Sequence, residues 1–300
     1  MAEISSSDFQ IVGPKYKEKT NKNTTKKSLK QLLKGKPVIS VIVLLAIILG
    51  CVFLGKTNTN SLYYLDHLNE PPNSQFYFGT DSLGRDIYAM IWSGGRASIM
   101  IGILSMIIIT IIGIAYGCIS GTSSQKVDLI MMRICELGNS IPNLLIILLL
   151  VSVMGTQNIF KISIVIGVTG WFGLARIVRS EVRQIRNSEY VLAAKCMGVN
   201  FLNLMTKHLI PNFVSSIMFV VVSSISSSMS MESTLSFLGL GLPVEVISWG
   251  SMLSLANKAL LLNTWWVIVI PGAFLIVTLL CITNIGNYFR KETNKGDSNL

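Results

Sequence analysis

The sequence predicts an all-α integral membrane protein with six transmembrane helices. Hydrophobic residues make up 51% of its 300 residues and charged residues only 13%, whereas about 25% of the residues in a soluble domain are charged. The apolar residues form long runs, and about 20 such residues are enough for a helix to span a bilayer. Six runs approach or exceed this length, at 37–55, 97–119, 129–154, 162–177, 213–231 and 265–289.

The first run contains no charged residue, and its end overlaps the stretch GCVFLGKT at 50–57, which fits the spacing of a phosphate-binding P-loop. A P-loop needs free backbone N–H groups around a phosphate. A spanning helix uses those groups for its own hydrogen bonds. We therefore predict a transmembrane helix here and no nucleotide site. Because 36 largely polar residues precede it, we expect the helix to be retained rather than cleaved as a signal peptide.

Residues 1–36 are expected to form a basic cytoplasmic tail that contains nine lysines. Leu29, Leu32 and Leu33 have helical spacing, which predicts either a short helix on the inner membrane surface or simply a solvated tail. Residues 290–300 are expected to form a second cytoplasmic tail.

The positive charges predict the orientation of the chain, which has a net charge of +10. If both termini are cytoplasmic, 20 of the 25 Lys and Arg residues lie on or near the inner side, and five lie outside. This asymmetry is typical of the positive-inside rule and requires an even number of spans. We interpret the basic excess as a topology signal, with the lipid bilayer and not nucleic acid as the partner.

Residues 37–93 are predicted to hold the first transmembrane helix and an extracytoplasmic loop. The loop ends in FGTDSLGRDIYAMIWSGGRAS, which combines Asp81, Arg85 and Asp86 with four glycines. We expect an ordered element here. Its charged residues either contact an external binding protein or brace the loop.

Residues 94–289 are predicted to form the core of the protein. In the third span, Arg133 and Glu136 are one helical turn apart, which favours an ion pair. The fourth span is short and contains Gly167, Gly170 and Gly173. Small residues at helical spacing allow close approach of helices, so we expect this span to be buried.

The fifth span ends in the serine-rich stretch SSISSSMSMES, in which Ser227, Ser230 and Glu232 are candidates for a pathway or a gate. A carboxylate at membrane depth usually faces a protein interior or a water-filled cavity. The alternatives are that Glu232 reaches outer water from a helix end, and that the hydroxyls bond to neighbouring helices. Glycines and a proline interrupt residues 232–262, which we place at the outer surface.

The longest polar stretch between spans on the inner side is the predicted cytoplasmic loop 178–211. Ser188 can cap a helix that begins at Glu189, Gly198 can end it in a left-handed conformation, and Pro211 can open the fifth span. Ala193 and Ala194 keep one side of this helix shallow, so it could fit a groove on a partner protein. The alternative is an ordinary solvated loop.

The stretch around this loop resembles the permease subunits of bacterial ATP-binding-cassette (ABC) importers, in particular the branch for oligopeptides, dipeptides and nickel. The matching residues are Glu189, Tyr190, Val191, Ala193, Ala194, Gly198, His208, Pro211 and Asn212. Two further blocks resemble the same branch, FGTDSLGRD at 78–86 and LSFLGLGLP with SWGSML at 235–253. The chain departs from the family pattern at Gln125–Val127 and at Asn287, which weakens assignment to a substrate subgroup.

The resemblance implies a type I ABC importer transmembrane domain that forms half of a pathway for short peptides, or for nickel or a metal chelate. It implies that Glu189, Tyr190, Ala193, Ala194, Gly198 and Pro211 belong to a loop that couples to a separate ATPase. The implied partners are a second permease, two cytosolic ATPase subunits and an extracytoplasmic substrate-binding lipoprotein. The location would be the plasma membrane of a bacterium.

We expect no catalytic residue, metal ligand or cofactor in this chain, and ATP would be bound by the partner subunits. Its two histidines, His67 and His208, lie on opposite sides of the membrane in the predicted topology. Two rival classes are a membrane-embedded enzyme and a membrane sensor or scaffold. Glu136 and Glu232 lie toward opposite faces of the bilayer in this topology, which argues against the enzyme.

Overall fold

The computed structural model describes residues 37–55, 64–189, 191, 196–199, 203, 210–243 and 245–297, without the side chains of 211–212, 257–258 and 292–297. The predicted tail 1–36 and Tyr190, Ala193 and Ala194 of the predicted loop lie outside the described residues. Residues 37–300 form one compact unit. This unit is described below.

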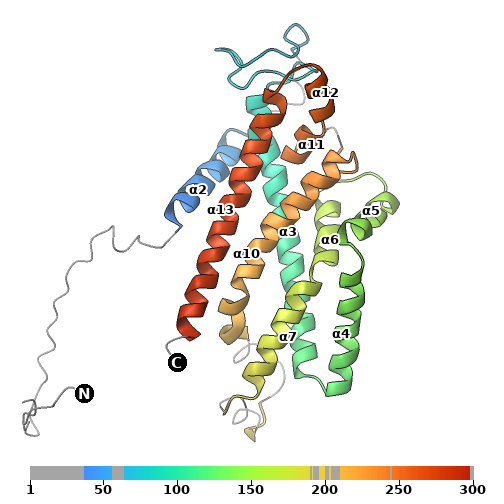
Figure 1. Cartoon of the computed structure of the whole chain (residues 1–300), viewed down its shortest axis with the longest axis vertical. Helices are drawn as coiled ribbons and strands as arrows, with labels where there is room; N and C mark the ends of the chain where they lie inside the picture. Colours follow the sequence, from blue (N-terminus) through green and yellow to red (C-terminus); the bar gives the residue numbers. More distant parts are fainter. Residues whose placement is uncertain are drawn as a thin grey trace, which may run out of the picture. The chain divides into compact units, whose positions relative to one another are not determined.

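The described residues are mostly helical (Figure 1). The bounds of the helices are α2 Val38–Phe53, α3 Ile87–Thr122, α4 Gln125–Ser140, α5 Asn143–Val153, α6 Ile159–Gly170, α7 Phe172–Arg186, α10 Ile210–Phe237, α11 Trp249–Leu253, α12 Ala256–Leu261 and α13 Trp266–Asp297.

Three of the described helices, α3, α10 and α13, are long and apolar enough to cross a membrane. The count rises to five if the bent pairs α4 with α5 and α6 with α7 are each one span. The first predicted span corresponds to α2, an apolar helix of 16 residues. Its helical residues include Gly50 to Phe53 of the P-loop-like stretch, whose Lys56 and Thr57 lie outside the described residues.

The predicted third and fourth spans are each divided into two helices. A bend of 82° separates α4 from α5 at Ile141 and Pro142, and a bend of 46° separates α6 from α7 at Trp171. Proline at 142 disfavours helical geometry at the preceding residue, which explains the first bend. Because α7 continues to Arg186, the first part of the predicted loop 178–211 is helical.

The helix α3 starts ten residues before the predicted 97, because Asp86 caps its N-terminus by accepting a hydrogen bond from the Tyr88 N–H. With 36 residues it is the longest described helix, and it contacts α2, α4, α6, α7, α10, α11 and α13. In Figure 1 it runs behind α10 and α13. The other helices therefore pack around α3.

Within the segment 232–262, which we expect at the outer surface, the side chains of Glu232 and Trp249 are both fully buried. The short helix α11 packs against α3, α10 and α13. Two glycines make this possible. A Cβ on Gly95 would lie 2.6 Å from the Trp249 ring, and a Cβ on Gly250 would lie 2.6 Å from the Ser233 Cα.

Candidate functional site

The segment that follows α7 carries the predicted coupling residues, of which only part is described. Glu189 is helical and exposed, whereas Val191 is fully buried and packs in one apolar cluster with Phe213 and Ile217 of α10. Gly198 has a φ of +76°, which confirms the predicted left-handed conformation. Pro211 lies in the first turn of α10, as predicted.

A buried carboxylate joins α4 to α7 just before this segment. Asp128, in the first turn of α4, is 1% exposed. Its Oδ1 accepts hydrogen bonds from Arg179 Nε at 2.9 Å and from the Ser120 hydroxyl at 2.6 Å, and its Oδ2 accepts one from Arg179 Nη2. Arg183 Nη2 lies 3.0 Å from the same Oδ2. Two arginines of α7 therefore neutralise one carboxylate of α4.

A third arginine of α7 ties it to the end of α3. Arg186 Nη1 donates to the carbonyls of Gly121, Thr122 and Ser123 at 3.2 to 3.3 Å. The last carbonyls of a helix have no partner within the helix and favour cations. Because Arg179, Arg183 and Arg186 are spaced i, i+4 and i+7, they share one face of α7. We call this set, together with Asp128, the arginine clamp.

The sequence contains a signal for the arginine clamp that the predictions above do not include. The spacing of the arginines predicts one basic helix face, and the acidic residue near the start of α4 offers it a partner. The predicted pair of Arg133 and Glu136 is confirmed, with Nη1 2.6 Å from Oε2, but both side chains are largely exposed. Such a pair contributes little to stability.

A cavity of about 310 Å³ lies between α10 and the bent pair α6 with α7, and α3 and α5 also contribute to its lining. Four serines of α10 line it, namely Ser223, Ser224, Ser227 and Ser228. Within the described residues, the Ser223 and Ser228 hydroxyls and Asn143 Oδ1 are buried without a hydrogen-bond partner. Unpaired buried polar atoms favour a polar occupant. We call this space the serine cavity.

Of the predicted pathway residues, Ser227 lines the serine cavity, whereas Ser230 is exposed and does not line it. Glu232 does not line it either. Its Oε1 accepts hydrogen bonds from the hydroxyls of Ser236 at 2.8 Å and Ser248 at 2.6 Å. Because Glu232 is 0% exposed, the alternative that it reaches outer water is wrong.

The Glu232 carboxylate connects three helices. Ser98 of α3 donates its hydroxyl to Oε2 at 3.4 Å and accepts the Trp249 N–H at 3.1 Å. Ser248, which also bonds to Glu232, is the N-cap of α11. Within the described residues no cation forms an ion pair with Glu232. The carboxylate therefore holds α11 against α3 and α10.

The charged residues before α3 form an ordered turn. Asp81 is 0% exposed, and it accepts the N–H groups of Leu83 and Arg85 and, at 2.7 Å, Arg85 Nε. Burial raises the pKa of the Asp86 carboxyl, and the backbone N–H groups of Tyr88 and Ala89 oppose the shift. This geometry supports the bracing alternative for both aspartates. A contact with a binding protein stays a prediction.

The chain is similar to known proteins along most of its length. The profile of the family described as binding-protein-dependent transport system inner membrane component matches residues 113–295. The oligopeptide transport system permease protein OppC of Bacillus subtilis is 36% identical over 264 residues, which cover 88% of this chain and 85% of that protein. The dipeptide transport system permease protein DppC of the same organism is 38% identical, with 74% and 69% covered. OppC of Haemophilus influenzae is 39% identical, with 74% and 70% covered.

Proposed function

Because the chain belongs to the family of binding-protein-dependent transport system inner membrane components, we propose that it is the permease subunit of an ABC importer that takes up short peptides. It is a multi-pass membrane protein, and in the proposed role it forms half of the transmembrane pathway. Peptide cargo is favoured over nickel or a metal chelate because relatives with 36 to 39% identity are named as oligopeptide or dipeptide permeases.

The observation that carries the proposal is the arginine clamp. It fastens α7 to α4 and to the end of α3, immediately before the segment that resembles the ATPase-coupling loop of the family. A coupling loop must pass a force to the membrane helices without bending at its base. Ion pairs and helix-end hydrogen bonds on three successive turns of α7 supply that stiffness. A sensor or scaffold has no need for this connection.

In this proposal, separate cytosolic subunits hydrolyse the ATP. The P-loop-like stretch lies partly in α2, where the backbone N–H groups serve the helix. Glu189, Tyr190, Ala193, Ala194 and Gly198 dock on an ATPase subunit, and closure of the ATPase pair moves α7 and α10. A second permease completes the pathway, and a binding lipoprotein delivers the peptide from outside.

The proposed topology has six spans, with α2 as the first and each bent pair as one span. Both termini and the coupling segment are then cytoplasmic, and α11 and α12 lie on the outer side. This arrangement agrees with the distribution of Lys and Arg.

The serine cavity suits peptide cargo of varied sequence. Serine hydroxyls both donate and accept hydrogen bonds. They can therefore pair with the N–H and C=O groups that all peptides share, independently of side chains. Ser223, Ser227 and Ser228 would serve in this way. The apolar residues of the same lining, such as Ile109 and Leu174, would face the peptide side chains.

The proposal is tested by reconstitution of the chain with its partner permease, ATPase subunits and binding protein in proteoliposomes. We expect ATP-dependent accumulation of a labelled tripeptide. Accumulation of free Ni²⁺ without peptide would contradict the cargo, and uptake without the ATPase subunits would contradict the importer. Copurification of the ATPase subunits should depend on Glu189 and Gly198.

A further inference from the structure

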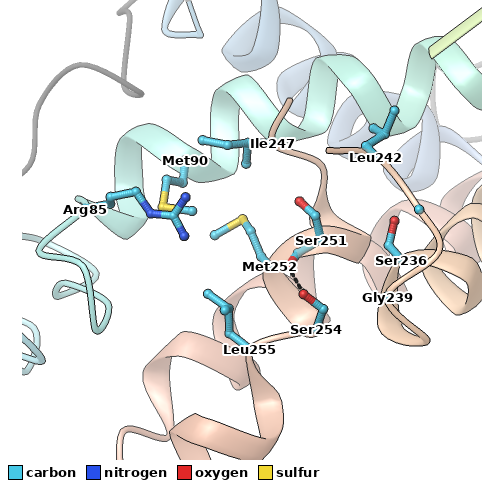
Figure 2. A pocket seen from close by; sticks show the side chains of 11 residues that line it. Arg85, Met90, Ser236, Gly239, Leu242, Ile247, Ser251, Met252, Ser254 and Leu255 are labelled. Atoms are coloured by element: carbon cyan, nitrogen blue, oxygen red, sulfur yellow. Dashed lines mark hydrogen bonds between the residues drawn. The ribbon is translucent and has the colours of Figure 1, made fainter. Parts of the chain in front are cut away.

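A second cavity, of about 190 Å³, lies beside α11 and the start of α3. Figure 2 shows Arg85 at one end and Ser236 and Leu242 toward the other. Met90, Met252 and Leu255 form apolar walls between these ends. The lining residues of this space are distinct from those of the serine cavity. We call it the Arg85 cavity.

Arg85 is only 5% exposed, and its guanidinium group points into the cavity (Figure 2). Its Nε donates to Asp81 Oδ2 at 2.7 Å. Within the described residues, Nη1 and Nη2 form no hydrogen bond. These two atoms present N–H donors in a planar fork, which matches the two oxygens of a carboxylate. These two atoms open onto the cavity, where the oxygens of an occupant can accept hydrogen bonds from them.

The electrostatic surroundings of Arg85 allow this second carboxylate. Asp81 already balances the charge of Arg85 through Nε, and its Oδ1 is occupied by two backbone N–H groups. The remaining lining is uncharged, and the Ser236 hydroxyl is directed to Glu232 Oε1. An occupant would therefore be held by hydrogen bonds to the free fork and by apolar contact.

The walls indicate that the occupant is more than a carboxylate. Met90, Met252 and Leu255 are apolar, and methionine adapts to side chains of different shape. An aspartate or glutamate on a docking protein would offer only a thin stem to these walls. The last residue of a peptide offers a carboxylate and a complete side chain together, and no chain continues beyond it.

We propose that the Arg85 cavity binds the carboxy-terminal residue of an incoming peptide. Its carboxylate lies on Arg85 Nη1 and Nη2, and its apolar side chain lies between Met90, Met252 and Leu255. Asp81 is a positioning residue that fixes the guanidinium through Nε. The proposal rests on the proposed function, since it needs peptide cargo and places α11 on the outer side.

The test compares the uptake of two labelled tripeptides in the reconstituted importer. Both end in leucine, one with a free carboxylate and the other with a carboxamide. The variants are Arg85→Lys, which keeps the charge but removes the planar fork, and Leu255→Trp, which fills the cavity. Leu261→Trp is the matched control, because Leu261 is 87% exposed on α12 and does not line the cavity. The same binding protein is used throughout, so its own preference cancels in the comparison.

We expect the ratio of acid to amide uptake to fall about tenfold in Arg85→Lys, which is the size of effect typical of hydrogen bonds to a charged group. Leu255→Trp should lower the uptake of both peptides, because both end in leucine. Both variants should copurify with the partner permease and the ATPase subunits as the unaltered chain does, which shows that they are folded. Leu261→Trp should leave the ratio unchanged. An unchanged ratio in Arg85→Lys would overturn the inference, and so would unchanged uptake of both peptides by Leu255→Trp. If the unaltered importer takes up neither peptide, the proposed function itself fails.

Discussion

Gly198 adopts a backbone conformation that most residues avoid. Its φ of +76° lies in the left-handed region, which asparagine and aspartate tolerate better than other L-residues. A Cβ added to Gly198 meets no atom within 4 Å among the described residues. Within this chain, a small side chain at this position therefore has space.

The left-handed conformation and the free space at Gly198 give a prediction that distinguishes backbone strain from disturbed contact with the ATPase. Gly198→Asn and Gly198→Asp place side chains of similar size in the same conformation, but only aspartate adds a negative charge near a helix C-terminus. We expect Gly198→Asp to insert normally and to reduce peptide uptake by about tenfold or more, and Gly198→Asn to keep most of it. Uptake assays and membrane fractionation measure both. Normal transport by both variants would contradict a coupling role for Gly198.

Glu232 is a fully buried carboxylate. Three serine hydroxyls donate to it, and Glu232→Ala would leave these three donors without their acceptor. An unsatisfied buried polar group costs about 1–3 kcal/mol. We expect Glu232→Ala to lower the free energy of unfolding by about 3 kcal/mol and Glu232→Gln to lower it less, because the amide keeps one acceptor oxygen.

Thermal unfolding in detergent measures this difference. Glu136→Ala is the control, since Glu136 is half exposed and its pair with Arg133 lies at the surface. A melting temperature of Glu232→Ala that equals that of Glu136→Ala would show that the buried carboxylate does not hold α11 in place.

The arginine clamp acts at the level of helices, because it connects α7 to α3 and α4. Asp128→Asn keeps the shape of the side chain but removes the charge that pairs with Arg179 and Arg183. We expect the assembled complex to keep ATP hydrolysis and to lose peptide uptake by about tenfold, because the force from the ATPase no longer reaches α4. The matched control is Glu136→Gln on the same helix, which should leave both activities unchanged.

The ratio of peptides transported to ATP hydrolysed is the deciding measurement. A structural role alone would lower uptake and ATP hydrolysis together as assembled complex is lost. A proportional decrease in the two would therefore argue against transmission through the clamp.

The sequence predicted helices well and helix interruptions poorly. Apolar runs located every long helix because a bilayer demands a minimum length of apolar chain. The same criterion gives no warning of bends, so residues 129–154 and 162–177 were each predicted as one span. Pro142 was the available signal for the first bend. At the second bend, Gly170 and Trp171 form no sequence pattern that predicts a break in a helix.

Long-range contacts were the other part that local patterns could not predict. The cap at Asp86, the left-handed Gly198 and the pair of Arg133 with Glu136 depend on neighbours in sequence, and all but the cap were predicted. The approach of Ser98 to Glu232, and of Asp128 to Arg179, joins residues far apart in the chain. A single sequence contains no rule that pairs them, although unpaired charges in apolar runs indicated that partners were needed.

The orientation of the whole protein can be tested with a cysteine that the chain already has. Cys196 is exposed, whereas Cys51, Cys118, Cys135 and Cys281 are buried. Because Cys196 lies in the proposed coupling segment, which the proposed topology places in the cytoplasm, we expect a membrane-impermeant maleimide to label it in inside-out vesicles and not in intact cells. Cys196→Ser should abolish the signal. Labelling of intact cells that disappears with Cys196→Ser would reverse the topology.

The bend of 82° between α4 and α5 has a consequence for the life of the protein in the cell. At such a bend the helical hydrogen-bond ladder stops, and backbone groups at bilayer depth tolerate no contact with lipid tails. They must be covered by protein or reached by water, and in the proposed complex the companion permease covers them. We therefore expect synthesis without the companion permease to yield a short-lived product that quality-control proteases remove.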